Sequence, residues 1–197
     1  MSKLEIKIAR GLDDLMMVHA IRAAVYMAEQ ECPYAEEFDG NDTCATHFVG
    51  FVDGEPAGCI RARYFHAFVK LERLAVLKRF RRSPIGFQLV RSGIDHARRK
   101  GFRRIYGHAR EGLEPFWARF GGKPVNGDRK LTFSGFRYTE MAVDVEPLPN
   151  AITLDSGGFV ILRPEGEWDQ PGILEISATR SVRDPGENVV RSTRAMT

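Results

Sequence analysis

The stretch from Glu72 to Val90 constrains the fold more than any other part of the chain. It combines an apolar strand, a short basic loop and the opening of an amphipathic helix. The free N–H groups at a helix N-terminus point outward with the positive end of the helix dipole, and arginines beside them add full charges. This order of elements predicts an α/β protein with a site for a phosphate or pyrophosphate at the start of the helix.

Length and composition predict one folded core with an appendage. The chain has 197 residues, of which 43% are hydrophobic, enough for one substantial core. No apolar run approaches the roughly 18 residues that span a bilayer, and the first ten residues alternate charged with apolar side chains. Three cysteines without paired spacing favour reduced thiols and no metal site. We therefore expect a cytoplasmic protein without membrane association.

The formal net charge of +3 is unevenly distributed, with basic clusters at 78–82 and 98–104. Such clusters can bind nucleic acid or a phosphorylated cofactor. The sequence has neither interleaved aromatic residues nor zinc-ligand spacing, which disfavours nucleic acid. The strand and helix that flank the first cluster favour the cofactor.

Hydrophobic periodicity predicts the order of elements up to residue 145. The predicted elements are a strand at 4–8, a helix from 13 to 27, an acidic loop at 29–42, a hairpin of 46–52 with 55–65, a strand at 68–77, a helix ending at 100–101, a strand at 104–109, a short helix at 113–120 and closing strands at 130–133 and 138–145. Composition changes after that point, so we expect a domain at 1–145 and an extension at 146–197. Two apolar runs, at 159–162 and 173–177, predict a β-hairpin or an ordered arm in the extension.

Several short motifs between Ile6 and Val145 resemble the GCN5-related N-acetyltransferases, the GNAT family. They are Arg22-x-x-Val25-Tyr26, Glu29-Gln30-x-Cys32-Pro33-Tyr34, Gly58-x-Ile60-Arg61, Leu74-Ala75-Val76, Phe116-Trp117-x-x-Phe120-Gly121 and Tyr138-x-Glu140-Met141. The first helix and loop are most similar to the ElaA-like bacterial acyltransferases. The resemblance implies a mixed, splayed β-sheet flanked by helices, with coenzyme A in the cleft.

The resemblance also implies which residues hold the cofactor. In such a fold the backbone of the strand before the basic loop binds the pantetheine arm, and the loop surrounds the pyrophosphate. The implied cofactor-binding residues are Leu74, Ala75, Val76, Arg81, Arg82, Ser83, Ile85, Gly86, Arg110 and Trp117. Pro84 replaces the first glycine of the family's loop pattern, which removes one N–H donor. An alternative is that Ser83 and Pro84 only start a helix, as its N-cap and first residue.

Transfer of an acetyl group to an amine requires a base, because a free alkylamine is protonated at neutral pH. Glu72 is the candidate catalytic residue. Its position two residues before Leu74 places it on the same face as Leu74 and Val76 unless a β-bulge intervenes. The alternative is a solvated or ion-paired glutamate. Trp117 stands where the family commonly has a tyrosine acid, and a core position for its ring is the competing interpretation.

Four acidic residues of the loop at 29–42 are candidates for attracting a cationic amine. They are Glu36, Glu37, Asp39 and Asp42. A solvated surface is the alternative for such a charge run. The histidines at positions 47, 66 and 108 lack metal-ligand spacing and are expected to be structural.

These features together predict an acetyl-CoA-dependent N-acetyltransferase that acts on a small-molecule or peptide amine by direct attack. Two alternatives remain. One is an acyl-homoserine-lactone-synthase-like enzyme that takes its acyl group from an acyl carrier protein; the other is a CoA-binding homologue without turnover. The extension after residue 146 could cover the sheet or a second subunit, which would make the protein a homodimer.

Overall fold

The computed structural model describes residues 2–125, 127 and 130–181. The chain divides into two compact units, Met1–Thr153 and Leu154–Thr197. None of the helices among the described residues is long and apolar enough to cross a membrane.

The first unit is built on one eight-stranded mixed sheet, which confirms the predicted α/β fold. The strand order is β1-β2-β3-β4-β5-β8-β6, and β7 pairs with β8 beside this path. The bounds are β1 Leu4–Ile8, β2 Thr46–Val52, β3 Glu55–Tyr64, β4 Val69–Val76, β5 Arg104–Arg110, β6 Lys123–Pro124, β7 Lys130–Phe133 and β8 Phe136–Asp144. Of the strands in the described residues, only β4 and β5 pair in parallel, and the long helix between them supplies the crossover that a parallel pair requires.

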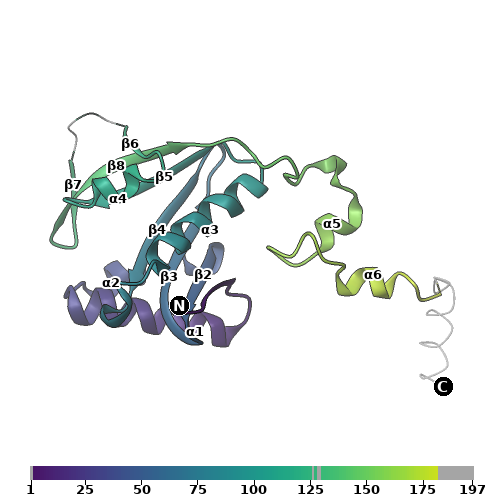
Figure 1. Cartoon of the computed structure of the whole chain (residues 1–197), viewed down its shortest axis with the longest axis horizontal. Helices are drawn as coiled ribbons and strands as arrows, with labels where there is room; N and C mark the ends of the chain where they lie inside the picture. The colour runs from purple at the N-terminus through teal and green to yellow at the C-terminus, as the bar shows by residue number, and fades with distance from the viewer. Residues whose placement is uncertain (1, 126, 128–129, 182–197) are drawn as a thin grey trace, which may run out of the picture. The chain divides into compact units, whose positions relative to one another are not determined.

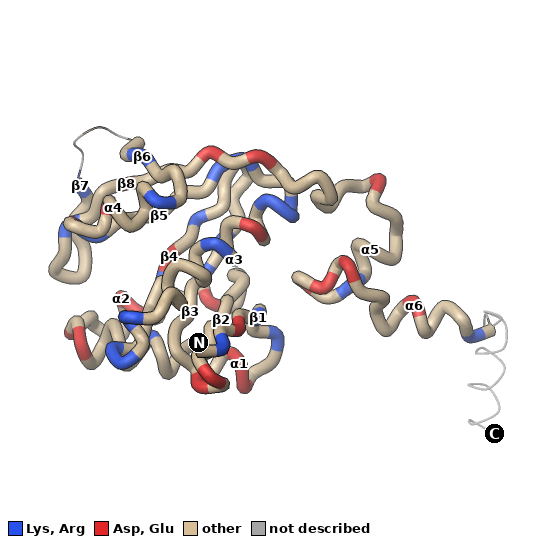
Figure 2. The backbone as a smooth tube through the Cα atoms, in the orientation of Figure 1, with Lys and Arg blue, Asp and Glu red and all other residues tan. Residues whose placement is uncertain are grey.

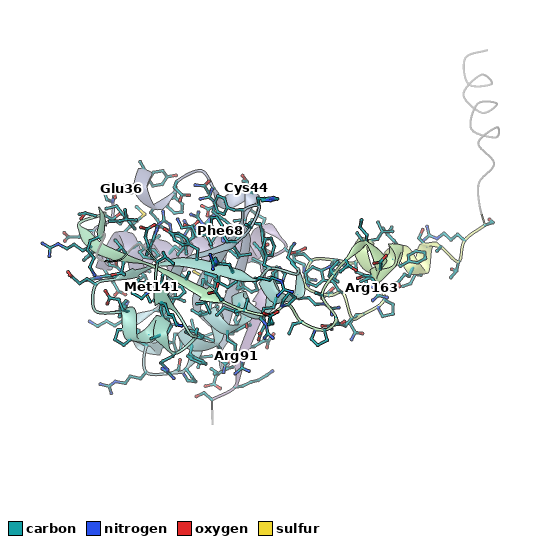
Figure 3. The ribbon with its side chains drawn as sticks, turned by 90° about the horizontal axis from the view of Figure 1, so that it is seen from above. Glu36, Cys44, Phe68, Arg91, Met141 and Arg163 are labelled. Carbon is teal, nitrogen blue, oxygen red and sulfur yellow. The ribbon has the colours of Figure 1, made fainter. Side chains whose placement is uncertain are left out.

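Helices cover both faces of this sheet (Figure 1). They are α1 Leu12–Arg22 with its π-helical continuation Ala23–Glu29, α2 Tyr34–Glu37, α3 Ile85–Arg99, α4 Glu114–Ala118 and the 3₁₀ turns Asp42–Cys44 and Lys78–Phe80. Helices α3 and α4 contribute to the larger core cluster, and α1 contributes to a smaller one on the opposite face. In Figure 3, Met141 of β8 lies between Arg91 of α3 on one side and Glu36 and Phe68 on the other.

The sheet splays open between β4 and β5. These strands pair only over Val69–Leu71 and Ile105–Gly107, although both continue for several residues. Figure 1 shows the two strands diverging beyond this contact. The divergence separates 72–76 of β4 from 108–110 of β5, so that residues of both strands can face a ligand between them.

The first unit extends beyond the predicted boundary at residue 145. Backbone N–H groups of Leu148 and Ile152 donate to the carbonyl oxygens of Arg98 and Arg99, at 3.1 and 2.7 Å. The Arg99 guanidinium also donates to the Asn150 carbonyl. The segment 146–152 is thus held against the end of α3.

The predicted β-hairpin of the extension is wrong. The two apolar runs are short helices, α5 Gly158–Leu162 and α6 Ile173–Ser177. Apolar runs of this length fit a strand or a helix turn equally well by periodicity. The local polar contacts favour the helix, because the Glu175 carboxylate accepts the N–H of Gly172 at the start of α6 and also pairs with Arg163 at 2.7 Å.

Candidate active site

The centre of the sheet has one polar face. Alternate residues of four adjacent strands contribute to it, as strand geometry requires. They are Arg61 and Arg63 of β3, Lys70 and Glu72 of β4, Tyr106, His108 and Arg110 of β5, and Tyr138 and Glu140 of β8. The register confirms the neighbours, since Arg61 lies opposite Glu72, Arg63 opposite Lys70 and His108 opposite Glu140. Basic and acidic positions lie next to one another along β4 in Figure 2.

A β-bulge at Arg73 divides β4 into two parts with different orientation. Arg73 has a φ of 54°, and the register slips between Cys59 and Arg61 of β3. One extra residue on β4 therefore places Glu72 and Ala75 on one face. Leu74 packs with the core on the α3 side instead. The expectation that Glu72 shares a face with Leu74 and Val76 is wrong for this reason.

Two cavities meet at the splay. The first, of about 530 Å³, contains much of the polar face and is called here the polar cavity. The second, of about 740 Å³, extends from β4 to the basic loop and is called the loop cavity. The residues that line both are Gln30, Leu74, Arg110, Leu113 and Phe116. A ligand in one cavity can thus reach a ligand in the other.

The loop cavity contains several of the predicted cofactor residues. Its lining includes Leu74, Val76, Arg81, Ser83, Gly86 and Arg110. Ala75 and Ile85 have side chains that are buried in the two core clusters, away from a ligand. Arg82 is exposed at the same loop.

Part of the hydrogen-bonding capacity of the loop is already used. The Ser83 N–H donates to the Phe80 carbonyl at 2.9 Å, and the Ile85 N–H approaches Ser83 Oγ at 3.4 Å. Helix α3 begins at Ile85, so Pro84 rather than Ser83 is its N-cap. The N–H of Gly86 lies in the first helical turn, where no intrahelical acceptor exists. Gly86 is therefore the loop's best placed backbone donor for an anion.

Two residues of β4 that line the loop cavity have carbonyl oxygens that already accept hydrogen bonds. The Tyr26 hydroxyl donates to the Leu74 carbonyl at 2.7 Å, and Arg81 Nε donates to the Val76 carbonyl at 3.0 Å. The Arg81 guanidinium in addition pairs with Glu29 at 2.5 Å. Arg81 thus joins the end of β4 to the π-helical segment.

Glu72 is surrounded by cations. Its carboxylate contacts Lys70 Nζ at 2.7 Å, Arg61 at 2.8 Å and Arg63 at 3.7 Å. Burial alone would raise the pKa of Glu72, but the hydrogen bond from Lys70 and the charge of Arg61 outweigh it and lower that pKa. A carboxylate in this state is a weak proton acceptor.

Most acidic residues of the loop at 29–42 form ion pairs with arginines of neighbouring elements. Glu37 is fully buried against Arg22 and lies 3.4 Å from Arg73. Asp39 pairs with Arg61 at 2.6 Å, and its pKa is lowered because hydrogen bonds from Arg61 outweigh the effect of burial.

Asp42 contacts Arg22 at 2.5 Å and Arg61 at 2.8 Å. Glu36 accepts a hydrogen bond from Ser134 at 2.5 Å. Of the four acids, only Asp39 lines the polar cavity, so their arrangement favours a structural network over attraction of a cation.

His108, which the sequence predicts to be structural, lines the polar cavity. Its Nε2 lies 2.9 Å from the Tyr106 hydroxyl, which donates to Glu140 at 2.5 Å. Since the hydroxyl donates to Glu140, it accepts from Nε2–H, and this assignment leaves Nδ1 with a lone pair. Burial and the charge of Lys70 lower the pKa of His108, so the imidazole is neutral at pH 7.

Arg110 and Trp117 lie at the wall between the cavities and the core. The Arg110 guanidinium stacks on Phe136 at 3.7 Å from the ring centroid. Trp117 lines the polar cavity with a small exposed surface, and its ring packs against Gly107 of β5. The ring thus lies in the core, as the alternative interpretation of the sequence predicts, and also forms part of the cavity wall.

The sequence has relatives among known proteins. The sequence model described as the acetyltransferase (GNAT) family matches residues 15–121. One Bacillus subtilis (strain 168) relative is 33% identical over 90 residues, which are 44% of this chain and 61% of that relative. The uncharacterized N-acetyltransferase YjcF of the same organism is 26% identical over 137 residues, 70% of this chain and 97% of YjcF.

Solved structures share the fold. Escherichia coli ElaA has a TM-score of 0.63 and 23% identity, covering 73% of this chain and all of ElaA. A GNAT family acetyltransferase from Elizabethkingia anophelis has a TM-score of 0.54 and 15% identity, covering 72% of this chain and 98% of that protein.

Proposed function

Since the chain belongs to the acetyltransferase (GNAT) family, we propose that it transfers an acetyl group from acetyl-CoA to a primary amine. The observation that carries this proposal is the pair of cavities that meet at the β4–β5 splay. A donor in the loop cavity and an acceptor in the polar cavity would come together beside Leu74 and Arg110. Direct transfer needs this arrangement, because both reactants must be held at once.

The loop cavity is the proposed site of the donor. Gly86 offers its N–H at the helix start, and exposed Arg82 adds charge for the pyrophosphate. The apolar side chains of Leu74 and Val76 would contact the pantetheine arm. The related structure from Elizabethkingia anophelis was determined with acetyl-CoA bound, which supports a donor of this class.

We assign proton acceptance to His108 in place of Glu72. The amine loses a proton to Nδ1 as its nitrogen attacks the thioester carbonyl, the C–S bond breaks, and the CoA thiolate leaves. The imidazolium that forms would be stabilised by Glu140 through the Tyr106 hydroxyl. Glu72, with its lowered pKa, instead holds Lys70 and Arg61 in place. Trp117 offers no acid for the thiolate, so water is the proposed proton donor.

The test is thiol release from acetyl-CoA with a panel of amines at pH 5–9. His108→Gln should lower kcat about a hundredfold or more, the usual cost of losing a general base. In the wild type, kcat/KM should rise through a pKa below the ordinary 6.5 of histidine and then level off. His66→Gln, at an exposed turn, is the matched control.

Three outcomes would contradict parts of this proposal. Unchanged turnover and pH profile in His108→Gln, with loss in Glu72→Gln, would return the base to Glu72. Turnover with an acylated carrier protein in place of acetyl-CoA would favour the autoinducer-synthase-like alternative. A rise in melting temperature with CoA but no thiol release with any amine would identify a CoA-binding protein without turnover.

A further inference from the structure

The polar cavity has an excess of positive charge. Four cationic side chains line it, Arg63, Lys70, Arg73 and Arg110. Among the residues that the structure describes, two carboxylates line it, Asp39 and Glu72, and both already form ion pairs with arginines. A cationic acceptor entering this cavity would meet like charge.

The excess is concentrated where β3 and β4 face each other. Arg63 and Lys70 are direct cross-strand partners, an arrangement that is unfavourable for like charges. Glu72 is the carboxylate between them, at 2.7 Å from Lys70 and 3.7 Å from Arg63. Buried Arg61 also pairs with Glu72, but it has Asp39 and Asp42 as further partners. Glu72 is then the one carboxylate paired with both Arg63 and Lys70, so one positive charge of these two is left uncompensated.

Arg110 adds positive charge at the other end of the cavity. It stacks on Phe136 and has no carboxylate within ion-pair distance in residues 2–125, 127 and 130–181. The positive field has two effects on an acceptor. It lowers the pKa of the amine, which favours the reactive neutral form, and it attracts an anionic group on the same molecule.

We propose that the acceptor is a primary amine that also carries a carboxylate, and that Arg63 and Lys70 bind the carboxylate. This inference rests on the proposed function. Lys70 lies four residues before Leu74, beside which donor and acceptor would meet, and four residues of a bulged strand span roughly 10 Å or more. The carboxylate and the reacting nitrogen should therefore be well separated, as in a long ω-amino acid or a short peptide.

The experiment compares three matched acceptors: an ω-amino acid, its methyl ester and the diamine of the same chain length. The wild type should show a kcat/KM for the ω-amino acid at least about tenfold above that for the ester, as one charge-assisted hydrogen bond provides. A short peptide with a free C-terminus and its amidated form separate the two sources of such an acceptor.

Arg63→Gln should bring the ratio of kcat/KM for the ω-amino acid to kcat/KM for the ester close to one. Arg63→Glu should reverse the preference in favour of the diamine, an effect that a purely structural arginine would not produce. Arg91→Gln, at an exposed site on the other side of the sheet in Figure 3, is the control of equal charge change. The CoA-dependent rise in melting temperature checks that each variant is folded.

The outcomes separate this inference from the function on which it depends. Equal acetylation of amino acid, ester and diamine by the wild type would overturn the carboxylate site and leave the acetyltransferase function standing. An unchanged preference in a folded Arg63→Glu variant would do the same. Absence of turnover in every arm would overturn both.

Discussion

Removing the Arg61 guanidinium should cost more stability than any surface ion pair in the protein. Its side chain is fully buried and lies within 2.6–2.8 Å of three carboxylates, those of Asp39, Asp42 and Glu72. Arg61→Met keeps most of the side-chain volume but leaves these carboxylates without a shared partner. Breaking a buried ion pair from one side typically costs about 3–5 kcal/mol. For a chain of this size that corresponds to a fall in melting temperature of about 6–20 °C.

The loss of unfolding free energy in Arg61→Met should become smaller at low pH. Burial would raise the pKa of Asp39 and Asp42, but hydrogen bonds from the arginines lower both pKa values overall. Groups with a lowered folded pKa bind fewer protons than in the unfolded chain, so their stabilisation is complete above about pH 4. It is lost as pH falls through the folded pKa. The difference between wild type and Arg61→Met should therefore narrow below about pH 4.

The assay is urea unfolding followed by tryptophan fluorescence between pH 3 and 8. Arg79→Met is the matched control, because Arg79 pairs with Glu55 where both side chains are largely exposed. The free energy of unfolding of Arg79→Met should fall by no more than about 1 kcal/mol. A loss below about 1 kcal/mol for Arg61→Met, or a loss that does not change with pH, would refute the role given to the buried network.

Two further predictions concern packing and the unit boundary. Gly107→Ala would place a Cβ atom 2.9 Å from the Trp117 ring, so it should lower the free energy of unfolding in urea by about 1–3 kcal/mol. Gly11→Ala meets no atom within 4 Å and should lose only the cost of alanine at the N-cap of α1, below about 1 kcal/mol. Equal losses in the two variants would contradict the steric argument. A chain ending at Glu146 should melt below one ending at Thr153, because it lacks two backbone hydrogen bonds to α3, each worth about 1 kcal/mol. Coincident melting curves would show that the segment 147–153 adds nothing to the first unit.

Features with a local cause could be predicted from the sequence. The Asp53-Gly54 turn gave the β2–β3 hairpin, and both residues have the positive φ values that such turns use. Gly101, with a φ of 86°, follows α3 where the prediction ended the helix. The loop cavity likewise lies at the strand, basic loop and helix of 72–90, where the sequence predicts an anion site.

Features that depend on distant partners could not be predicted in this way. The sequence of the acidic loop alone predicts a binding surface for cations. Its acidic residues instead pair with Arg22 and Arg61, which nothing in the loop's own sequence indicates. One missed signal was available, however. Polar residues at alternate positions, as in Tyr106-x-His108-x-Arg110, indicate a strand with one polar face, and four neighbouring strands with this pattern mark the site.

Because of the bulge at Arg73, the number of residues in β4 determines which of its side chains face each side of the sheet. Side chains alternate with a period of two, so a single inserted residue changes the phase of everything after it. Glycine at this position would keep the backbone path, since it accepts a φ of 54° without strain. Deletion of the residue would instead exchange the side chains that line the loop cavity, the proposed donor site, with those that pack on α1. A strand usually tolerates substitution better than a change in length. Here one residue of length separates Glu72, in the proposed acceptor site, from Leu74 and Val76, in the proposed donor site.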